Sequence, residues 1–232
     1  MASRNSVKTY SENSFYHIYN RGVEKRNIFL DSQDSGVFLS YLKTYLLPRG
    51  GAFLNKKISS GQSSTTEKNE AKKLLRLKNY SDDMELICYA LLPNHFHLLV
   101  KQKSNVINRF MNSLGTRYGM YFNRRYRRTG VLFQDVYKAL LVNSDEQLLH
   151  LSRYIHLNPI EALNLPISRW REAKYPSSLP EYFGLRNSTW VKTNYILDYF
   201  TKRPGAKDNY ENFLDLDIDP IITSMVGIDI EE

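Results

Sequence analysis

Two apolar runs joined by Pro93-Asn94 constrain the fold more than any other feature of the chain. The runs at 84–92 (MELICYALL) and 95–102 (HFHLLVKQ) each have the length of a strand. A proline–asparagine step between two such runs is typical of a tight turn, so the pattern predicts an antiparallel hairpin. Side chains alternate between the two faces of a strand, which places His95 and His97 together on one face.

Further helix and strand patterns surround this hairpin. The stretch before Pro48 has apolar side chains at helical spacing behind an Asp31 or Ser32 cap, and Ser144 with Gln147 forms a second capping pattern. We expect strands at 14–20 and 131–142 and helices from 31 or 32 to about 47, from 105 to 125, and from 144 towards Pro159. This order predicts an α+β fold: a ferredoxin-like or RRM-like antiparallel sheet with helices packed on it.

Two segments depart from that compact pattern. Residues 50–83 are rich in Gly, Ser, Thr and Lys, which favours a mobile insertion with a short helix at 70–78. From Pro166 the pattern becomes irregular, with one expected helix at 191–201. We therefore predict one domain over residues 1–180, followed by an irregular and helical C-terminal extension over 181–232 that ends in an acidic tail.

Composition excludes several classes of protein. An apolar content of 42% suffices for a sizeable core, and no run of eighteen apolar residues exists that could span a membrane. The N-terminal segment has no apolar stretch of a secretory signal. Cys88 is the single cysteine, which excludes an internal disulfide or a thiolate zinc cluster. We expect a cytoplasmic protein with no membrane partner.

Positive charge is concentrated in one part of the chain. The net charge is +8, and residues 86–134 contain no Asp or Glu. Basic side chains interleave there with aromatic ones, a pattern typical of a surface that binds phosphates and stacks bases. A solvated helix face is the alternative. The candidate DNA-binding residues are Arg117, Arg124, Arg125, Arg127, Arg128, Lys101 and Lys138.

The candidate chemistry centres on His95 and His97. Two imidazoles on one strand face make half of a metal site, or they are two histidines satisfied by their neighbours. Tyr154 and Asn158 lie four residues apart and so share a helix face; the asparagine oxygen could be a third ligand. Among 17 tyrosines, a buried helix tyrosine is the more common case, and by base rates alone it would be the interpretation of Tyr154.

Two other histidines could have a supporting role near the site. His17 lies on the first predicted strand, and His150 precedes Tyr154 by four residues, so it shares the face of that tyrosine. Each could contact the site from outside the metal ligands. A simple packing role is the alternative for both.

Four blocks resemble one known family in their residues and order. They are YHIYNRG (16–22), LLPNHFHLLV (91–100), YFNRRYRRTGVLFQDVYKALLV (121–142) and RYIHLNPIEA (153–162). They are similar to the HUH single-tyrosine transposases, in particular to the REP-associated tyrosine transposases and their relatives. The resemblance covers roughly residues 14 to 180.

The resemblance implies a chemistry and a substrate. His95 and His97 would be the His-hydrophobic-His metal ligands, Asn158 would take the place of the third polar ligand, and Tyr154 would be the catalytic nucleophile. The ion would be Mg²⁺ or Mn²⁺. The family cuts single-stranded DNA, often beside a hairpin, and holds the 5′ phosphate on tyrosine. Residues 50–83 and the long C-terminal tail depart from compact family members, so hairpin recognition and a homodimer stay open.

Three alternatives remain at this stage. A sheet with aromatic and basic side chains could bind single strands or RNA without cutting them. A host-adopted nuclease that processes repeats would have the same residues as a mobile transposase. A hydrolytic metallonuclease would use the histidines but form no tyrosine adduct.

Overall fold

A four-stranded antiparallel sheet forms the centre of the computed structural model, which describes residues 10–201 and 210–216. The strands are β1 (Ser14–Arg21), β2 (Met84–Leu92), β3 (His95–Gln102) and β4 (Lys138–Val142). They lie in the order β2-β3-β1-β4, and each neighbouring pair is antiparallel. This is the ferredoxin-like arrangement, and it confirms the predicted α+β fold class. The hairpin of β2 and β3 begins and ends at the residues predicted for it.

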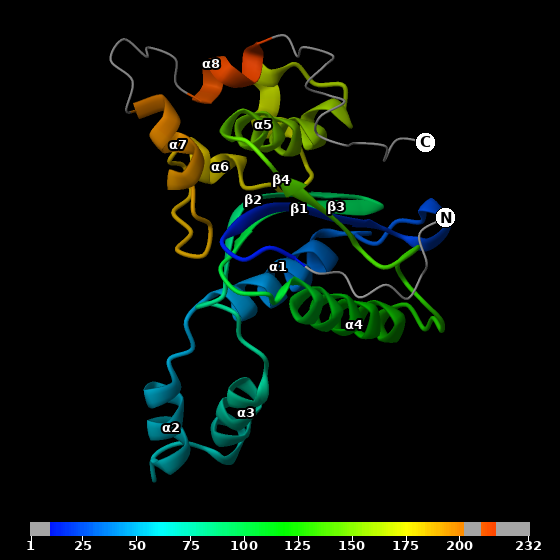
Figure 1. Ribbon diagram of the computed structural model, residues 1–232. Helices are drawn as coiled ribbons and strands as arrows, with labels where there is room; N and C mark the ends of the chain where they lie inside the picture. Colours follow the sequence, from blue (N-terminus) through cyan, green and yellow to red (C-terminus); the bar gives the residue numbers. More distant parts are fainter. Residues whose placement is uncertain (1–9, 202–209, 217–232) are drawn as a thin grey trace.

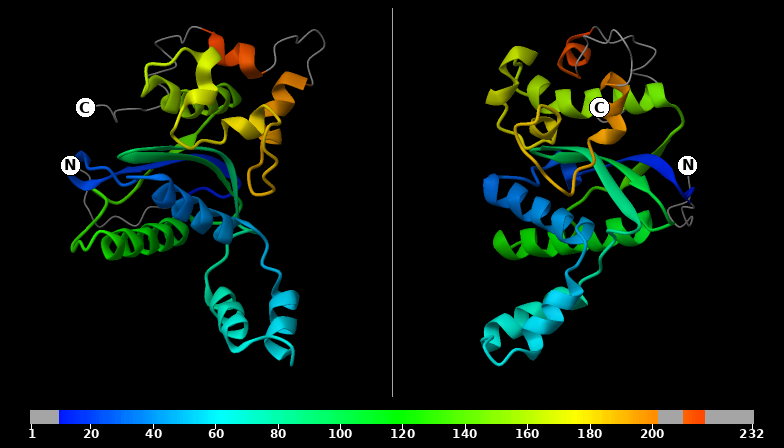
Figure 2. Two further views of the ribbon diagram at one scale, coloured as in Figure 1. Left: turned by 180° about the vertical axis from the view of Figure 1, so that it is seen from behind. Right: turned by 90° about the vertical axis from the view of Figure 1, so that its left-hand side faces the viewer.

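Helices cover both faces of the sheet (Figure 1). On one face lie α1 (Ser32–Leu46) and α4 (Ile107–Arg125). On the other lie α5 (Asp145–Glu161), the 3₁₀ helix η2 (Ile167–Glu172), α6 (Leu179–Tyr182), α7 (Asn194–Thr201) and α8 (Tyr210–Asp215). Two views at right angles show the same three layers (Figure 2). Because side chains alternate between the two faces of each strand, the sheet contributes to two separate hydrophobic cores, one on each face.

A buried acidic network joins α1 to α4. The Asp31 side chain caps α1 by accepting hydrogen bonds from the backbone of Gln33 and Asp34. The Asp34 side chain is fully buried and accepts from Tyr121, Tyr126 and Arg125, with the guanidinium nitrogen of Arg125 2.6 Å from a carboxylate oxygen. Arg125 also pairs with Asp31. This network ties the start of α1 to the end of α4.

The predicted strand at 131–142 is wrong in its first half. Only Lys138–Val142 pairs with β1, and residues 131–137 form a single bridge, between Gly22 and Phe133. The reason is that Phe133 turns away to pack against Phe96 and Tyr118 in the α4 core. A helix-side contact therefore overrides the β propensity of that segment.

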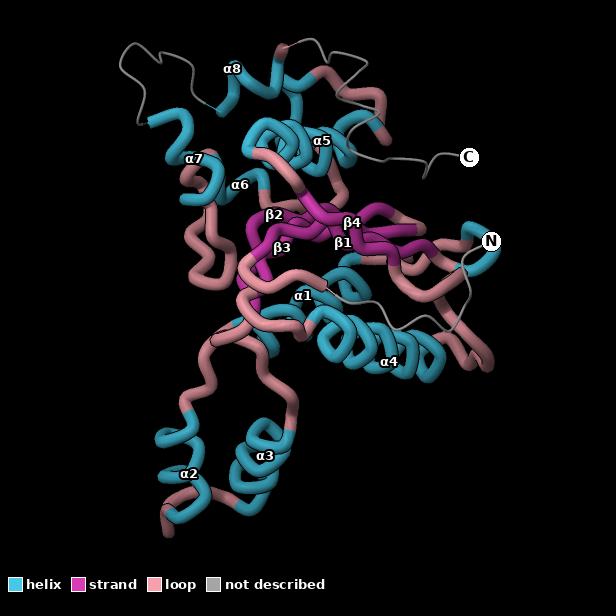
Figure 3. Tube along the Cα trace, viewed as in Figure 1, coloured by secondary structure: helices cyan, strands magenta, loops and turns pink. Residues whose placement is uncertain are grey.

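The insertion is helical where the composition suggested a loop. It forms α2 (Gly51–Ser59) and α3 (Thr65–Arg76), which lie side by side and project from the α1–α4 side of the sheet (Figures 1 and 3). The predicted short helix at 70–78 is real but begins earlier, because Ser64 and Glu67 form a reciprocal capping box.

The described part of the C-terminal extension, residues 181–201 and 210–216, is irregular and helical, as expected. The predicted boundary at residue 180 falls inside α6, and the expected helix at 191–201 begins at Asn194. Most of the acidic tail lies outside the described residues. No helix within the described residues has both the length and the apolar character needed to cross a membrane.

Candidate active site

The two histidines of β3 lie on the sheet face that α5 covers. The β1–β3 register places Tyr19 opposite His97 and Arg21 opposite His95. Residues opposite each other in a ladder share a face, so β1 presents His17, Tyr19 and Arg21 beside the β3 histidines. The structure thus brings together the two predicted ligands and His17.

The turn before β3 fixes the tautomer of His95. The Asn94 side chain donates from Nδ2 to the carbonyl of Lys25 at 3.3 Å, which directs its Oδ1 towards His95 Nδ1 at 2.6 Å. A carbonyl oxygen only accepts, so His95 Nδ1 carries the proton and Nε2 keeps its lone pair. Gly22 also belongs to this turn. It donates to the Asn94 carbonyl, and a Cβ there would lie 2.3 Å from the Arg26 carbonyl oxygen.

His97 has a matching partner in His17. The Nδ1 atom of His97 lies 2.9 Å from His17 Nε2, and the two rings stack with centroids 5.1 Å apart. His97 is fully buried, and its Nε2 has no hydrogen-bond partner. A buried nitrogen left without a partner is costly unless something else binds it. Both β3 histidines therefore engage Nδ1 with a neighbour and leave Nε2 for a ligand.

Burial keeps these imidazoles neutral. Desolvation lowers the pKa of His17 to about 3 and the pKa of His95 to about 4, with the nearby Arg21 charge adding to the second shift. The pKa of His97 falls well below 6.5 through desolvation first and then through His17 and His95. A neutral imidazole is the form that binds metal ions in general, and these pKa shifts leave the cluster in that form near pH 7.

Helix α5 positions Tyr154 over the histidines. Ser144 caps the helix by accepting from Gln147, as the capping pattern predicted. The Tyr154 ring meets the His97 ring edge-on, with centroids 5.4 Å apart at 89°, and the His17 ring at 6.4 Å. Tyr154 is half-buried, which leaves part of it accessible from solvent. The predicted tyrosine and histidines thus come from two distant segments to one place.

Asn158 stays on the helix although proline follows it. Pro159 lies inside α5, which continues to Glu161, so Asn158 keeps the helix face of Tyr154. Its Nδ2 donates to the Tyr154 carbonyl at 2.9 Å, and Oδ1 is the atom that could bind an ion. Within residues 10–201 and 210–216, no three His, Cys, Asp or Glu side chains form a metal site. An ion here would rest on two imidazoles and a neutral oxygen.

The two histidines of α5, His150 and His156, pack against other parts of the protein. His150 is half-buried against the Phe213 ring, at 5.2 Å between centroids, and the structure gives it no contact with the β3 histidines. His156 is fully buried between the hydroxyls of Tyr210 and Ser178, each 2.8 Å from a ring nitrogen. His17 and His150 looked alike in the sequence, and the structure separates them.

The predicted DNA-binding residues divide between two faces. Arg125 is engaged by Asp31 and Asp34, and Arg117 stacks on Tyr41 at 3.8 Å. Five of the seven belong to α4 or to the chain just after it, on the face opposite the histidines: Arg117, Arg124, Arg125, Arg127 and Arg128. Lys138 and Lys101 lie on the histidine face. Lys138 Nζ is 5.6 Å from the centre of the Tyr19 ring, beside the cluster.

Sequence reasoning missed Arg21. It lies opposite His95 at the end of β1, and its Nε is buried without a hydrogen-bond partner. The available signal was the period of two along β1, since residues 17, 19 and 21 share one face. Arg21 is thus the cation closest in register to the two β3 histidines.

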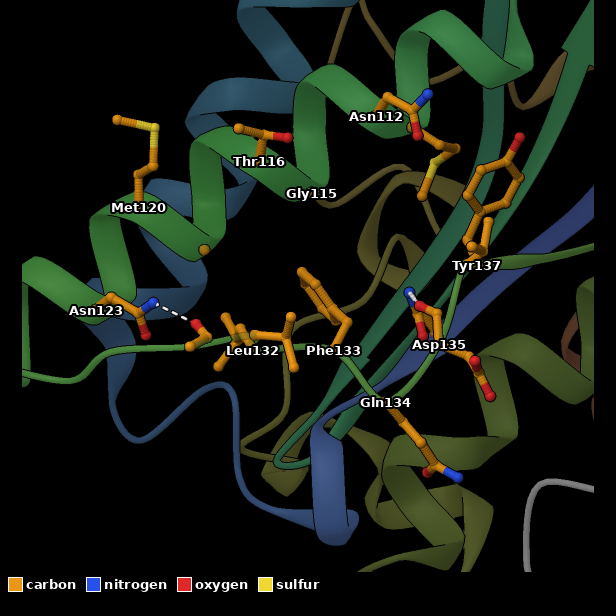
Figure 4. A pocket seen from close by; sticks show the side chains of 16 residues that line it. Asn112, Gly115, Thr116, Met120, Asn123, Leu132, Phe133, Gln134, Asp135 and Tyr137 are labelled. Carbon is orange, nitrogen blue, oxygen red and sulfur yellow. Dashed lines mark hydrogen bonds between the residues drawn. The ribbon is translucent and has the colours of Figure 1, made fainter. Parts of the chain in front are cut away.

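A pocket on the described part of the chain lies away from the histidines (Figure 4). It has a volume of about 500 Å³ between α4 and residues 130–137. Asn112 and Thr116 of α4 line one side of it, Phe133 points towards α4 from the other side, and Asn123 donates to the Gly130 carbonyl. It lies on the α4 face of the sheet, so it is not the site of the clustered imidazoles.

Comparisons with known proteins found one matching family model and several similar solved structures. Residues 59–158, which include both β3 histidines, Tyr154 and Asn158, match the family model described as IS200-like transposase. A solved REP-associated tyrosine transposase bound to a REP hairpin is similar at 10% identity with a TM-score of 0.48. That match covers 81% of this chain and 96% of the other. No curated protein matches the chain.

Proposed function

We propose that the chain, whose residues 59–158 match the model of the IS200-like transposases, cuts and rejoins single-stranded DNA through a 5′-phosphotyrosine at Tyr154. The observation that carries the proposal is the edge-on approach of the Tyr154 ring to His97, whose buried Nε2 has no partner. A nucleophile and a vacant ligand atom from two distant segments meet on one face of the sheet.

His95, His97 and Asn158 would hold a divalent ion, Mg²⁺ or Mn²⁺. The donor set fits, because both imidazoles are neutral with Nδ1 engaged, and Asn158 offers an amide oxygen without charge. The bound ion would supply Lewis acidity to a phosphate oxygen. Imidazole is a softer ligand than Mg²⁺ prefers, so we expect Mn²⁺ to bind more tightly in vitro.

The protein supplies the nucleophile and binds the phosphate. The Tyr154 oxygen attacks phosphorus in line, the bond between phosphorus and the 3′ oxygen breaks, and the proton lost by the phenol ends on the departing 3′ hydroxyl. Arg21 and Lys138 lie beside the cluster and can hold the nonbridging oxygens. The adduct keeps the energy of the phosphodiester, so a second 3′ hydroxyl can reverse the step and join strands.

The test is capture of the covalent intermediate on a DNA hairpin with unpaired flanks in the presence of Mn²⁺. The chemistry predicts that a 3′ label stays with the protein on a denaturing gel, whereas a 5′ label leaves on the released strand. Tyr154→Phe should abolish the band. The matched control is Tyr41→Phe, which also removes a hydroxyl but lies on α1, in the opposite layer.

Two results would refute the proposal. One is the absence of any covalent band with the unmodified protein, together with strand cleavage, which would indicate a hydrolytic nuclease. The other is an undiminished band with Tyr154→Phe. Binding without cleavage or adduct would instead favour a non-catalytic single-strand-binding module.

A further inference from the structure

We propose that α2 and α3, with the residues that join them to the domain (residues 49–78, the helical arm), bind the phosphate backbone of duplex DNA. The arm projects from the α1–α4 side of the sheet in every view (Figures 1 and 2). The inference rests on the proposed function in one respect only, that DNA is the partner. It adds a second contact surface, remote from the tyrosine.

The arm carries most of the net charge of the chain. It contains eight basic and two acidic residues, a net charge of +6, against +8 for all 232 residues. Among the described residues its one ion pair joins Lys57 to Glu67 at 3.1 Å, and Arg49 donates to the Leu75 carbonyl. Six cations of the arm have no acidic partner there: Lys56, Lys68, Lys72, Lys73, Arg76 and Lys78. Unpaired cations at this density are the footprint of a phosphate-backbone contact.

Three of these cations form a stripe along α3. Lys68, Lys72 and Arg76 are four residues apart, which places them on one helix face. At 1.5 Å of rise per residue the stripe is about 12 Å long. Duplex DNA presents one phosphate per strand in about every 3.4 Å of its axis, so the stripe can face several phosphates.

The core of the domain does not require these side chains. Ala71 is the one buried residue of the two arm helices, and α2 and α3 pack on each other. Next to the arm, the Asn79 side chain donates to the carbonyls of Thr44 and Leu47 at the end of α1 and so connects the base of the arm to that helix.

The exposed surface of the arm favours a polyanion over a membrane. Its large exposed apolar side chains are Phe53 and Leu74, at 69% and 41% exposure. A helix that lies in a membrane surface needs a continuous apolar face. Phe53 and Leu74 lie on different helices and do not form such an apolar face. The stripe of Lys68, Lys72 and Arg76, by contrast, is continuous along one face of α3.

The test compares two triple variants that remove the same charge. The arm variant is Lys68→Gln, Lys72→Gln and Arg76→Gln; glutamine is a good helix former, and circular dichroism checks that α3 persists. The control variant is Lys43→Gln, Arg171→Gln and Lys174→Gln, three exposed cations outside the arm. Affinity for a labelled DNA hairpin is measured between about 50 and 200 mM salt.

The slope of log affinity against log salt concentration should become less negative by roughly 2 to 3 in the arm variant. The reason is that each lost phosphate contact removes about 0.9 from the slope. The control variant should change the slope much less, and affinity for an unpaired oligonucleotide should change little in either. Equal slopes for the two variants would overturn the proposal, and so would an equal loss on unpaired DNA. Adduct formation by Tyr154, assayed in parallel, judges the proposed function separately.

Discussion

Replacing His17 with leucine should weaken metal binding without unfolding the protein. The His97 tautomer that could bind an ion through Nε2 carries its proton on Nδ1. In that tautomer, His97 Nδ1 donates to His17 Nε2 across 2.9 Å. Leucine fills the space but accepts nothing, so the ion-binding tautomer of His97 must then bury an unpaired N–H. That costs about 1–3 kcal/mol. The corresponding loss of Mn²⁺ affinity is roughly 10- to 100-fold, the usual effect of removing such a partner.

Calorimetric titration of the apoprotein with Mn²⁺ measures this effect directly. His17→Gln should restore part of the affinity, because its amide oxygen can accept the same proton. His150→Leu is the control, since His150 packs against Phe213 and should leave the affinity unchanged. A His17→Leu protein that binds Mn²⁺ as tightly as the unmodified protein would refute the reasoning. Failure of the unmodified protein to bind Mn²⁺ would refute the metal site itself.

Three other substitutions test the framework and the site. Asp34→Ala removes a fully buried carboxylate that accepts from Arg125 and two tyrosines, and should lower the free energy of unfolding in urea by about 3–5 kcal/mol; a loss near zero would contradict the network. Burial lowers the pKa of His156 from 6.5 to about 3, so the unfolded chain binds its proton first as pH falls. Stability from this residue is present above pH 6.5 and falls by about 2 kcal/mol between pH 6.5 and 4.5, and His156→Gln should remove that part of the pH dependence of the urea midpoint. Arg21→Met should slow adduct formation on the order of 100-fold with an unchanged melting temperature, and an unchanged rate would exclude a phosphate contact.

The sequence alone determined the local geometry of the candidate site. The alternation of a strand placed His95 and His97 on one face, and the turn signal at Pro93-Asn94 gave the hairpin its limits. The Ser144 cap marked the start of α5, and the four-residue spacing placed Tyr154 and Asn158 on one face of that helix. These properties depend on backbone periods of two and 3.6 residues, which neighbouring segments do not change.

The same periods did not predict which charged residues are exposed and which form ion pairs. Arg124 and Arg125 are adjacent and identical in type, yet Arg124 is exposed and Arg125 closes the network on Asp31 and Asp34, some ninety positions earlier. The helical arm was misjudged for a related reason, since its composition is that of a loop. Its capping box and the packing of α2 on α3 decide otherwise.

Tertiary structure also decided which residues support the histidines. His17 and Arg21 reach the cluster because β1 lies between β3 and β4, whereas His150 packs against Phe213 of α8. A repeat along one segment fixes the direction of a side chain, but the partner in that direction comes from a segment distant in the chain. The sequence therefore determined which way the two β3 histidines face, and only the packing of β1 and α5 against them completed a site.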